Sequence, residues 1–323
     1  MIAIDADLEA ARSFLRRSLS PSRLVRSDAL SRQIGANVYL KLESELPTGS
    51  FKVRGALYAL WQRSQNGPVR QIVAASTGNH GAAVAFAAER MGIGARIFVP
   101  AGANPVKLAR IRALGGDVSE CGATLSSALD AAAEHAERHG AYLMEDPSDP
   151  HIAAATGTIG AEILEQIPMV DGVYVPVGDT ALIRGVAAAI KARKPGVRII
   201  GVQAAEAPAY FRSWKSGDVI STATANTIAD GLATTRAIEP NVVAIRALVD
   251  DMVLVTEQAL LHAVRWLLLE DHIVAEPSGA ATVAALTRDP PSRGAAGVEN
   301  IVLLITGSNI APAVLRAAAA LES

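Results

Sequence analysis

The chain has 323 residues, which at about 150 residues per domain suggests two domains. Its 30 Lys and Arg against 32 Asp and Glu give a formal net charge of −2, without the basic excess that nucleic acid or an anionic membrane surface requires. Hydrophobic residues make up 50% and charged residues 19%, which indicates a globular chain with a large core. The single cysteine, Cys121, excludes an internal disulfide and a cysteine-cluster metal site.

Short apolar runs alternate with Ala-rich amphipathic segments along the chain. The pattern predicts parallel sheets covered by helices on both faces. The predicted strands are 38–43, 72–75, 95–100, 118–121, 141–145, 172–177, 198–203, 252–256 and 300–305. The predicted helices include 50–62, 81–91, 106–114, 126–138 and 311–321, and a surface loop is expected at 289–297. So many strands favour two α/β domains, with ligands in a cleft at the carboxyl ends of the strands.

The first residues of the chain and its hydropathy indicate the cellular compartment. The first nine residues carry Asp5, Asp7 and Glu9 and no basic segment, so we expect no signal peptide. No apolar run reaches about 18 residues, so we expect no membrane span. Together these features predict a cytoplasmic protein.

A turn with Pro47 and Gly49 links the first predicted strand to the first helix, which Ser50 can cap. Lys52 then lies in the first turn, where the helix dipole disfavours a cation. One interpretation is an ordinary exposed lysine. The other is a lysine whose lowered pKa makes its amine a nucleophile or a base.

A second polar loop, 76–81, has the sequence Ser-Thr-Gly-Asn-His-Gly and lies between an apolar strand and an apolar helix. Its hydroxyls, its flexible glycine and the free N–H groups of a helix start suit a carboxylate. Ordinary helix capping is the alternative, and His80 is then a histidine with a structural partner.

A third loop, 176–185, again joins a strand to a helix, and its N–H groups could bind a phosphate. It has neither the dinucleotide G-x-G-x-x-G spacing nor a Walker Gly-Lys-Ser/Thr. Because a carboxylate beside a phosphate is unfavourable, we expect Asp179 to point away or to cap the helix. A capped turn without a ligand is the alternative.

A fourth loop, 305–309, follows the last predicted strand with the sequence Ile-Thr-Gly-Ser-Asn. Small polar residues at the carboxyl end of such a strand belong in the ligand cleft of a parallel sheet. A solvated turn is the alternative.

In this order along nearly the whole chain, the four loops resemble those of the fold-type-II pyridoxal-phosphate enzymes, and among them the serine/threonine dehydratases. The stretch 48–56 is similar to their Schiff-base lysine motif, and 157–163, 227–232 and 276–281 are also typical. The resemblance implies pyridoxal 5′-phosphate as cofactor. It also implies a two-domain α/β fold of the tryptophan synthase β type, with mostly parallel sheets flanked by helices. We expect a large cofactor-binding domain at 1–70 plus 149–323 and a small mobile domain at 71–148.

The resemblance further implies a role for each site residue. Lys52 forms the Schiff base and is the catalytic residue, Phe51 flanks the cofactor ring, and Asn79 bonds its 3′-oxygen. Thr306 faces the ring nitrogen. The cofactor phosphate is held by Gly178, Asp179, Thr180, Ala181 and Leu182. The substrate carboxylate is bound by Ser76, Thr77, Gly78, Asn79 and His80.

Some positions depart from the family pattern. The usual glycines of the phosphate loop are Gly-Asp-Thr-Ala at 178–181, where backbone donors and the Thr180 hydroxyl remain to bind phosphate. Gln203 and Ala209 stand where metal-dependent members carry acidic ligands, so we expect no metal ion. Thr77 stands where racemases place a second acid/base serine, which weakens racemisation.

We therefore expect elimination of water from a β-hydroxy amino acid, L-threonine, L-serine or a related substrate, giving a 2-oxo acid and ammonia. Alternatives in the same chemistry are a dehydratase for a bulkier β-hydroxy amino acid, an amino acid racemase and a β-replacement synthase. The Lys52 motif argues against a non-catalytic binding protein, and the missing glycine fingerprint against a dinucleotide oxidoreductase. We expect a homodimer whose partner is the amino acid substrate, not nucleic acid or a membrane.

Overall fold

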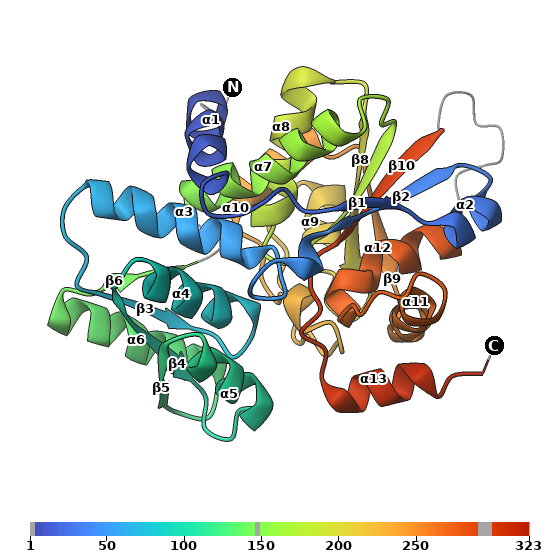
Figure 1. The fold of residues 1–323 in the computed structure, drawn as a ribbon. Helices are drawn as coiled ribbons and strands as arrows, with labels where there is room; N and C mark the ends of the chain where they lie inside the picture. The colour runs from blue at the N-terminus through green and yellow to red at the C-terminus, as the bar shows by residue number, and fades with distance from the viewer. Residues whose placement is uncertain (1–3, 146–148, 290–298, 323) are drawn as a thin grey trace.

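The computed structural model describes residues 4–145, 149–289 and 299–322, and it contains two sheets flanked by helices (Figure 1). The larger sheet has the strand order β1-β2-β10-β7-β8-β9 and is parallel except for the antiparallel edge strand β1. Its strands are β1 (Leu24–Arg26), β2 (Asn37–Leu42), β7 (Gly172–Pro176), β8 (Arg198–Ala204), β9 (Asp251–Val255) and β10 (Asn300–Ile305). The mostly parallel α/β architecture expected from the sequence is confirmed.

The larger sheet is buried on both faces because its central strands β10, β7 and β8 are mostly apolar. In β10, Ile301 and Leu303 belong to the core under α11 and α12, while Val302 and Leu304 belong to the core under α7 and α8. The helices that accompany this sheet are α1 (Ile4–Leu15), α2 (Asp28–Ile34), α3 (Lys52–Gln65), α7 (Pro150–Gln166), α8 (Ala181–Arg193), α9 (Ala209–Ser216), α10 (Glu239–Leu248), α11 (Glu257–Leu269), α12 (Pro277–Arg288) and α13 (Pro312–Ala319). This two-sided burial is what a continuous apolar strand predicts.

The smaller sheet is entirely parallel, with the order β5-β4-β3-β6. Its strands are β3 (Gln71–Ala75), β4 (Gly94–Val99), β5 (Gly116–Glu120) and β6 (Tyr142–Leu143), and its helices are α4 (Asn79–Arg90), α5 (Pro105–Ala113) and α6 (Leu125–His139). Ile72 and Ile97 pack toward α4 and α5, while Val73 and Phe98 pack toward α6. The first of these cores also contains Leu57 of α3, so one apolar cluster joins the smaller sheet to the rest of the molecule.

The predicted strands and helices are present, with small differences at their ends. Ser50 does not cap α3 as expected, because it forms an isolated antiparallel bridge with Gly307 and the helix begins at Lys52. Helix α4 begins two residues before the predicted start, which places Asn79 and His80 in its first turn. The short elements α1, β1 and α2 were not predicted. The surface loop expected at 289–297 lies almost wholly outside the described residues.

None of the described helices combines the length and apolar character that a membrane crossing needs. Likewise, across 4–145, 149–289 and 299–322 there is no group of three or more His, Cys, Asp or Glu that could hold a metal ion.

Helices α7 and α8 approach closely through glycines. A Cβ on Gly160 of α7 would lie 2.7 Å from the Val186 carbonyl oxygen, and one on Gly185 of α8 would lie 2.2 Å from the Ala153 carbonyl oxygen. Carbon and oxygen atoms do not approach so closely without displacing backbone. The glycines therefore set how closely α8 packs against α7. They also set the position of the loop that leads into α8.

We predict that Gly185→Ala destabilises the protein by about 1–3 kcal/mol or more, because the added methyl group overfills this contact. The matched control is Gly196→Ala, since a Cβ at Gly196 meets nothing within 4 Å. Thermal and chemical denaturation of both variants measure the difference. Equal stability of the two variants would contradict the packing argument.

Candidate active site

A cavity of about 600 Å³ lies where the carboxyl ends of strands from both sheets meet. It is bounded by the residues that follow β3, β6, β7 and β10 and by the start of α3. The predicted site residues in its lining are Phe51, Lys52, Ser76, Thr77, Gly78, Asn79, His80, Gly178, Asp179, Thr180, Leu182 and Thr306. Ala181 is the one predicted residue outside this lining; it is buried at the start of α8. The structure thus brings together loops that are far apart in the sequence.

Lys52 is the first residue of α3, and its side chain points into the cavity. Its Nζ lies 3.0 Å from Oδ2 of Asp179 and 5.1 Å from the centre of the Phe51 ring. The lysine side chain is only 15% exposed, so its amine is confined between the start of α3 and the loop that follows β7.

The sequence predicted that Asp179 would point away from the cavity or cap the following helix, and the structure shows the second of these. The Oδ1 of Asp179 accepts a hydrogen bond from the Ala181 N–H at 2.9 Å, so the side chain caps α8. It does not point away from the cavity, because its Oδ2 faces Lys52. The charge of Asp179 also acts on Arg184, one turn into α8. Burial lowers the pKa of Arg184, and the negative charge of Asp179 partly opposes that shift.

The backbone of the same loop is unusual. Thr180 has φ 76° and ψ −10°, a left-handed conformation that is rare for a β-branched residue. A Cβ at Gly178 would lie 2.2 Å from the Gly231 carbonyl oxygen, so only glycine fits there. The loop therefore turns sharply into the start of α8, where the Ala181 N–H is bonded to Asp179 and the next N–H belongs to Leu182, which lines the cavity. Helix-start N–H groups suit an anion.

The loop 76–80 forms the start of α4. Ser76 Oγ accepts a hydrogen bond from the Gly78 N–H at 3.1 Å, and His80 Nε2 lies 3.1 Å from the Met144 carbonyl oxygen. His80 thus has a structural partner, as one of the two interpretations proposed. The first N–H groups of any helix have no partner within the helix, and at α4 those of Asn79 and His80 belong to residues that line the cavity.

Asn79 is held by two residues that the sequence did not single out as site residues. Its Nδ2 donates to Glu276 Oε1 at 2.6 Å, and its Oδ1 accepts from Asn309 Nδ2 at 2.6 Å. These two bonds fix which end of the amide faces which partner. Burial raises the pKa of Glu276 to about 7, and the hydrogen bond from Asn79 acts against that rise. The sequence signals for these two residues were the family-typical stretch 276–281, which begins with Glu276, and the polar loop 305–309, which ends with Asn309.

Comparison with known proteins gives the family. The model of the pyridoxal-phosphate dependent enzyme family matches residues 15–307. The chain belongs to this family. An L-threonine ammonia-lyase of Thermotoga maritima is 37% identical over 310 residues, which cover 96% of this chain and 76% of the relative.

Solved structures agree with the family assignment. Maize serine racemase superposes with a TM-score of 0.91 at 29% identity, covering 97% of this chain and 95% of that one. Threonine deaminase isoform 2 of Solanum lycopersicum has a TM-score of 0.91 at 31% identity, covering 98% and 86%. The fold is that of fold-type-II pyridoxal-phosphate enzymes, and the cofactor is pyridoxal phosphate.

The residues of the cavity fit this cofactor. An amine from Lys52 is available for an aldehyde, and the start of α8 offers N–H groups for a phosphate. Gly178 approaches the Gly231 carbonyl too closely for any side chain at position 178, so the wall of that subsite is backbone at this point. The Thr306 hydroxyl, at the end of β10, is the polar side chain available to a ring nitrogen.

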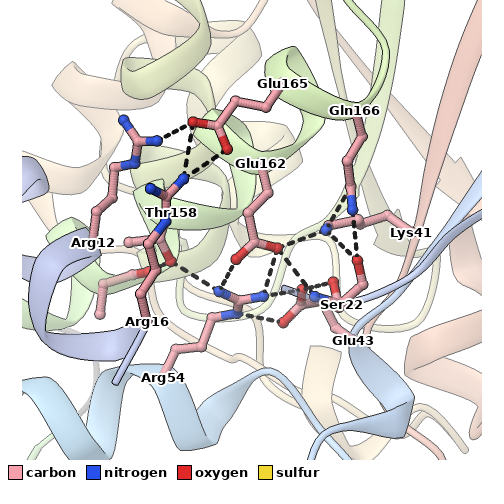
Figure 2. A network of polar contacts seen from close by, with 11 residues as sticks. Arg12, Arg16, Ser22, Lys41, Glu43, Arg54, Thr158, Glu162, Glu165 and Gln166 are labelled. Atoms are coloured by element: carbon pink, nitrogen blue, oxygen red, sulfur yellow. Dashed lines mark hydrogen bonds and ion pairs between the residues drawn. The ribbon is translucent and has the colours of Figure 1, made fainter. Parts of the chain in front are cut away.

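Behind Lys52, a buried network of charges fixes the start of α3 (Figure 2). Arg54 is 1% exposed and donates to Glu43 at 2.8 Å and to Glu162 at 2.6 Å. Lys41 donates to the same Glu162 at 2.6 Å, and Ser22 Oγ donates to Glu43 at 2.6 Å. Two cations and two carboxylates thus compensate one another, as buried charges must.

The network is linked to pH through Glu162. Burial raises the pKa of Glu162, whereas the positive charges of Arg54 and Lys41 and their hydrogen bonds lower it. The lowering is larger, so the pKa of Glu162 lies below its usual value. A carboxyl group whose pKa is depressed by folding contributes stability above its unfolded pKa. That contribution is lost as the pH falls through the folded pKa, so the stability that Glu162 contributes to the network is lost in acid.

We predict that Arg54→Met destabilises the protein by about 3–5 kcal/mol, because it leaves the Glu43 carboxylate buried without a cation. The matched control is Arg23→Met, which removes an exposed ion pair with Glu45 and should change stability little. Chemical denaturation at neutral pH measures both. If Arg54→Met were as stable as Arg23→Met, the network would not hold α3 in place.

Proposed function

We propose that the protein eliminates water from L-threonine or L-serine and releases a 2-oxo acid and ammonia. The carrying observation is that Lys52, the 76–80 loop and Thr306 line one cavity. The similarity to the Thermotoga maritima L-threonine ammonia-lyase supports the reaction, and the fold supports the cofactor. The reaction needs a base at Cα, a site for the α-carboxylate and an environment that favours loss of the β-hydroxyl. The chain provides groups for each.

Lys52 is the proposed base. When bound, pyridoxal phosphate supplies an aldehyde for amines and a ring that accepts electron density from Cα. The Lys52 amine lies at the start of α3, held by the network around Arg54, and takes the proton from Cα of a substrate in the cavity. Because the amine is already positioned, little entropy is lost when it acts.

The loop 76–80 is the proposed carboxylate subsite. Its helix-start N–H groups and the hydroxyls of Ser76 and Thr77 can donate to both carboxylate oxygens. Asn79 lines the cavity and is fixed by Glu276 and Asn309, and its remaining amide hydrogen is proposed to donate to the 3′-oxygen of the cofactor. The phosphate is proposed to lie against the start of α8.

Thr306 is proposed to favour elimination over transamination. It is 4% exposed at the end of β10, and its hydroxyl is neutral at all working pH values. A carboxylate there would stabilise a protonated ring nitrogen and long-lived charge in the ring. A hydroxyl does not, so charge at Cα is relieved by loss of the group on Cβ.

The assembly and location of the protein are also proposals. Residues 71–148, which contain the smaller sheet, are proposed as a small domain that moves against a larger one at 1–70 plus 149–323. An ion pair between Lys107 of α5 and Asp230, in the 3₁₀ turn Asp230–Leu232, supports contact across the cavity between the two. A cytoplasmic homodimer is proposed from the composition and the family.

We predict that Lys52→Ala lowers turnover of L-threonine by ~10³-fold or more, because it removes the base and the amine that binds the cofactor. Release of 2-oxobutanoate and ammonia, together with the visible absorption of lysine-bound cofactor, measures the effect. Lys191→Ala, which removes an ion pair with Asp250 on the far end of α8, is the control and should behave as wild type. Retention of the absorption in Lys52→Ala would place the Schiff base on another residue.

We predict that Asp179→Asn holds pyridoxal phosphate on the order of tenfold more tightly than wild type, since it removes a negative charge beside the phosphate. Asparagine keeps an oxygen for the Ala181 N–H, so the cap of α8 is retained. Equilibrium dialysis of the cofactor measures the change, and Asp117→Asn on the surface of β5 controls for net charge. Equal or weaker retention by Asp179→Asn, at unchanged melting temperature, contradicts this role.

A further inference from the structure

Helix α6 carries an apolar stripe that extends beyond the core. Ala128 and Ala132 are fully buried against Val73 and Phe98 of the smaller sheet. Leu125 and Leu129, one turn apart on the same side of the helix, are 54% and 37% exposed and both line the cavity. Such large side chains leave water only when something apolar covers them. Nothing in the described protein does so.

The position of this stripe relates it to the substrate. Helix α6 follows β5 as α4 follows β3, so the starts of both helices lie at the carboxyl edge of one parallel sheet. Loop 76–80, the proposed carboxylate subsite, is at the start of α4. Ala75, Ala82 and Met144 are further apolar residues in the lining. An apolar wall therefore adjoins the place where the substrate is held.

The charges of the cavity argue against an acidic side chain on the substrate. Its lining has three cationic side chains, Lys52, Lys107 and Arg110, of which Lys107 is already paired with Asp230. Against them stand four carboxyl groups, those of Glu145, Asp179, Asp230 and Glu276. A bound cofactor phosphate adds further negative charge. A second carboxylate on the substrate would have no free excess of positive charge to bind it.

We propose that the preferred substrate is a β-hydroxy amino acid whose Cβ carries a branched aliphatic or aryl group, with Leu125 and Leu129 contacting that group. This inference rests on the proposed elimination reaction and assigns it a preferred substrate with a larger group on Cβ than L-threonine or L-serine has. The reaction stays balanced: the C–O bond at Cβ and the C–H bond at Cα break, and water leaves. Hydrolysis of the resulting imine then consumes one water and releases ammonium and an uncharged-side-chain 2-oxo acid.

The test compares kcat/KM of the holoenzyme for L-threo-3-phenylserine, L-3-hydroxyleucine, L-threonine and L-3-hydroxyaspartate. We expect at least about a tenfold preference for the first two over threonine, the selectivity that hydrophobic contact supplies. Leu129→Ser, and independently Leu125→Ser, should reduce this preference about tenfold, because kcat/KM for the two bulky substrates falls more than kcat/KM for threonine. Val243→Ser, which changes an exposed residue of α10 outside the cavity, should leave the preference unchanged. A preference for threonine or hydroxyaspartate overturns the inference, as does an unaltered preference in both leucine variants.

A binding measurement separates this inference from the proposed function. L-phenylalanine and L-alanine carry no leaving group on Cβ, so they report occupancy by thermal shift without elimination. Stronger binding of phenylalanine that is lost in Leu129→Ser supports the apolar subsite even if no β-hydroxy amino acid is deaminated, a result that would overturn the elimination reaction alone. Turnover of threonine with no advantage for phenylalanine or the bulky substrates overturns the apolar subsite alone.

Discussion

The guanidinium of Arg54 between Glu43 and Glu162 is the contact on which the geometry of the site depends. Glu43 follows β2, Glu162 belongs to α7, and Arg54 is in the first turn of α3, so α7 is joined at one buried point to two elements much earlier in the chain. A buried ion pair adds little net stability, because desolvation offsets its attraction. Its value here is positional, since a misplaced partner would leave an uncompensated charge. Lys52, two residues before Arg54, shares that fixed position.

The topology of the two sheets brings the other loops of the site together. Parallel strands place all their carboxyl ends at one edge, so polar loops after β3, β7 and β10 reach the same cavity without any direct sequence relation. The apolar cluster that joins α3 to the smaller sheet keeps the two edges facing one another. Chemistry carried by short loops can therefore differ from member to member of the family while the surrounding strands stay as they are.

Much of this arrangement could be predicted from the sequence because the local signals are strong. Apolar runs located the parallel strands. Polar residues between a strand and a helix located the loops that hold Lys52 and Asn79, and polar residues directly after the last strand located the loop of Thr306. What could not be predicted depends on residues far apart in the chain. The inward oxygen of Asp179 follows from the proximity of Lys52, and Glu276 enters the site through Asn79. Ser50 could have capped α3, but pairing with Gly307 took precedence. Local sequence patterns do not predict contacts with residues so far away in the chain.

The left-handed backbone of Thr180 has a consequence for how an anion is received. A β-branched residue in this conformation costs on the order of 1–3 kcal/mol, which the surrounding packing must sustain. The seating of α8 against α7 through Gly160 and Gly185 provides that support. Because folding has already imposed the turn, a phosphate at the proposed position would have no loop to order. Binding of an anion at this end of the cavity would then depend on charge and desolvation. A glycine in place of Thr180 would make the loop more flexible, so that part of the binding free energy would be needed to order it.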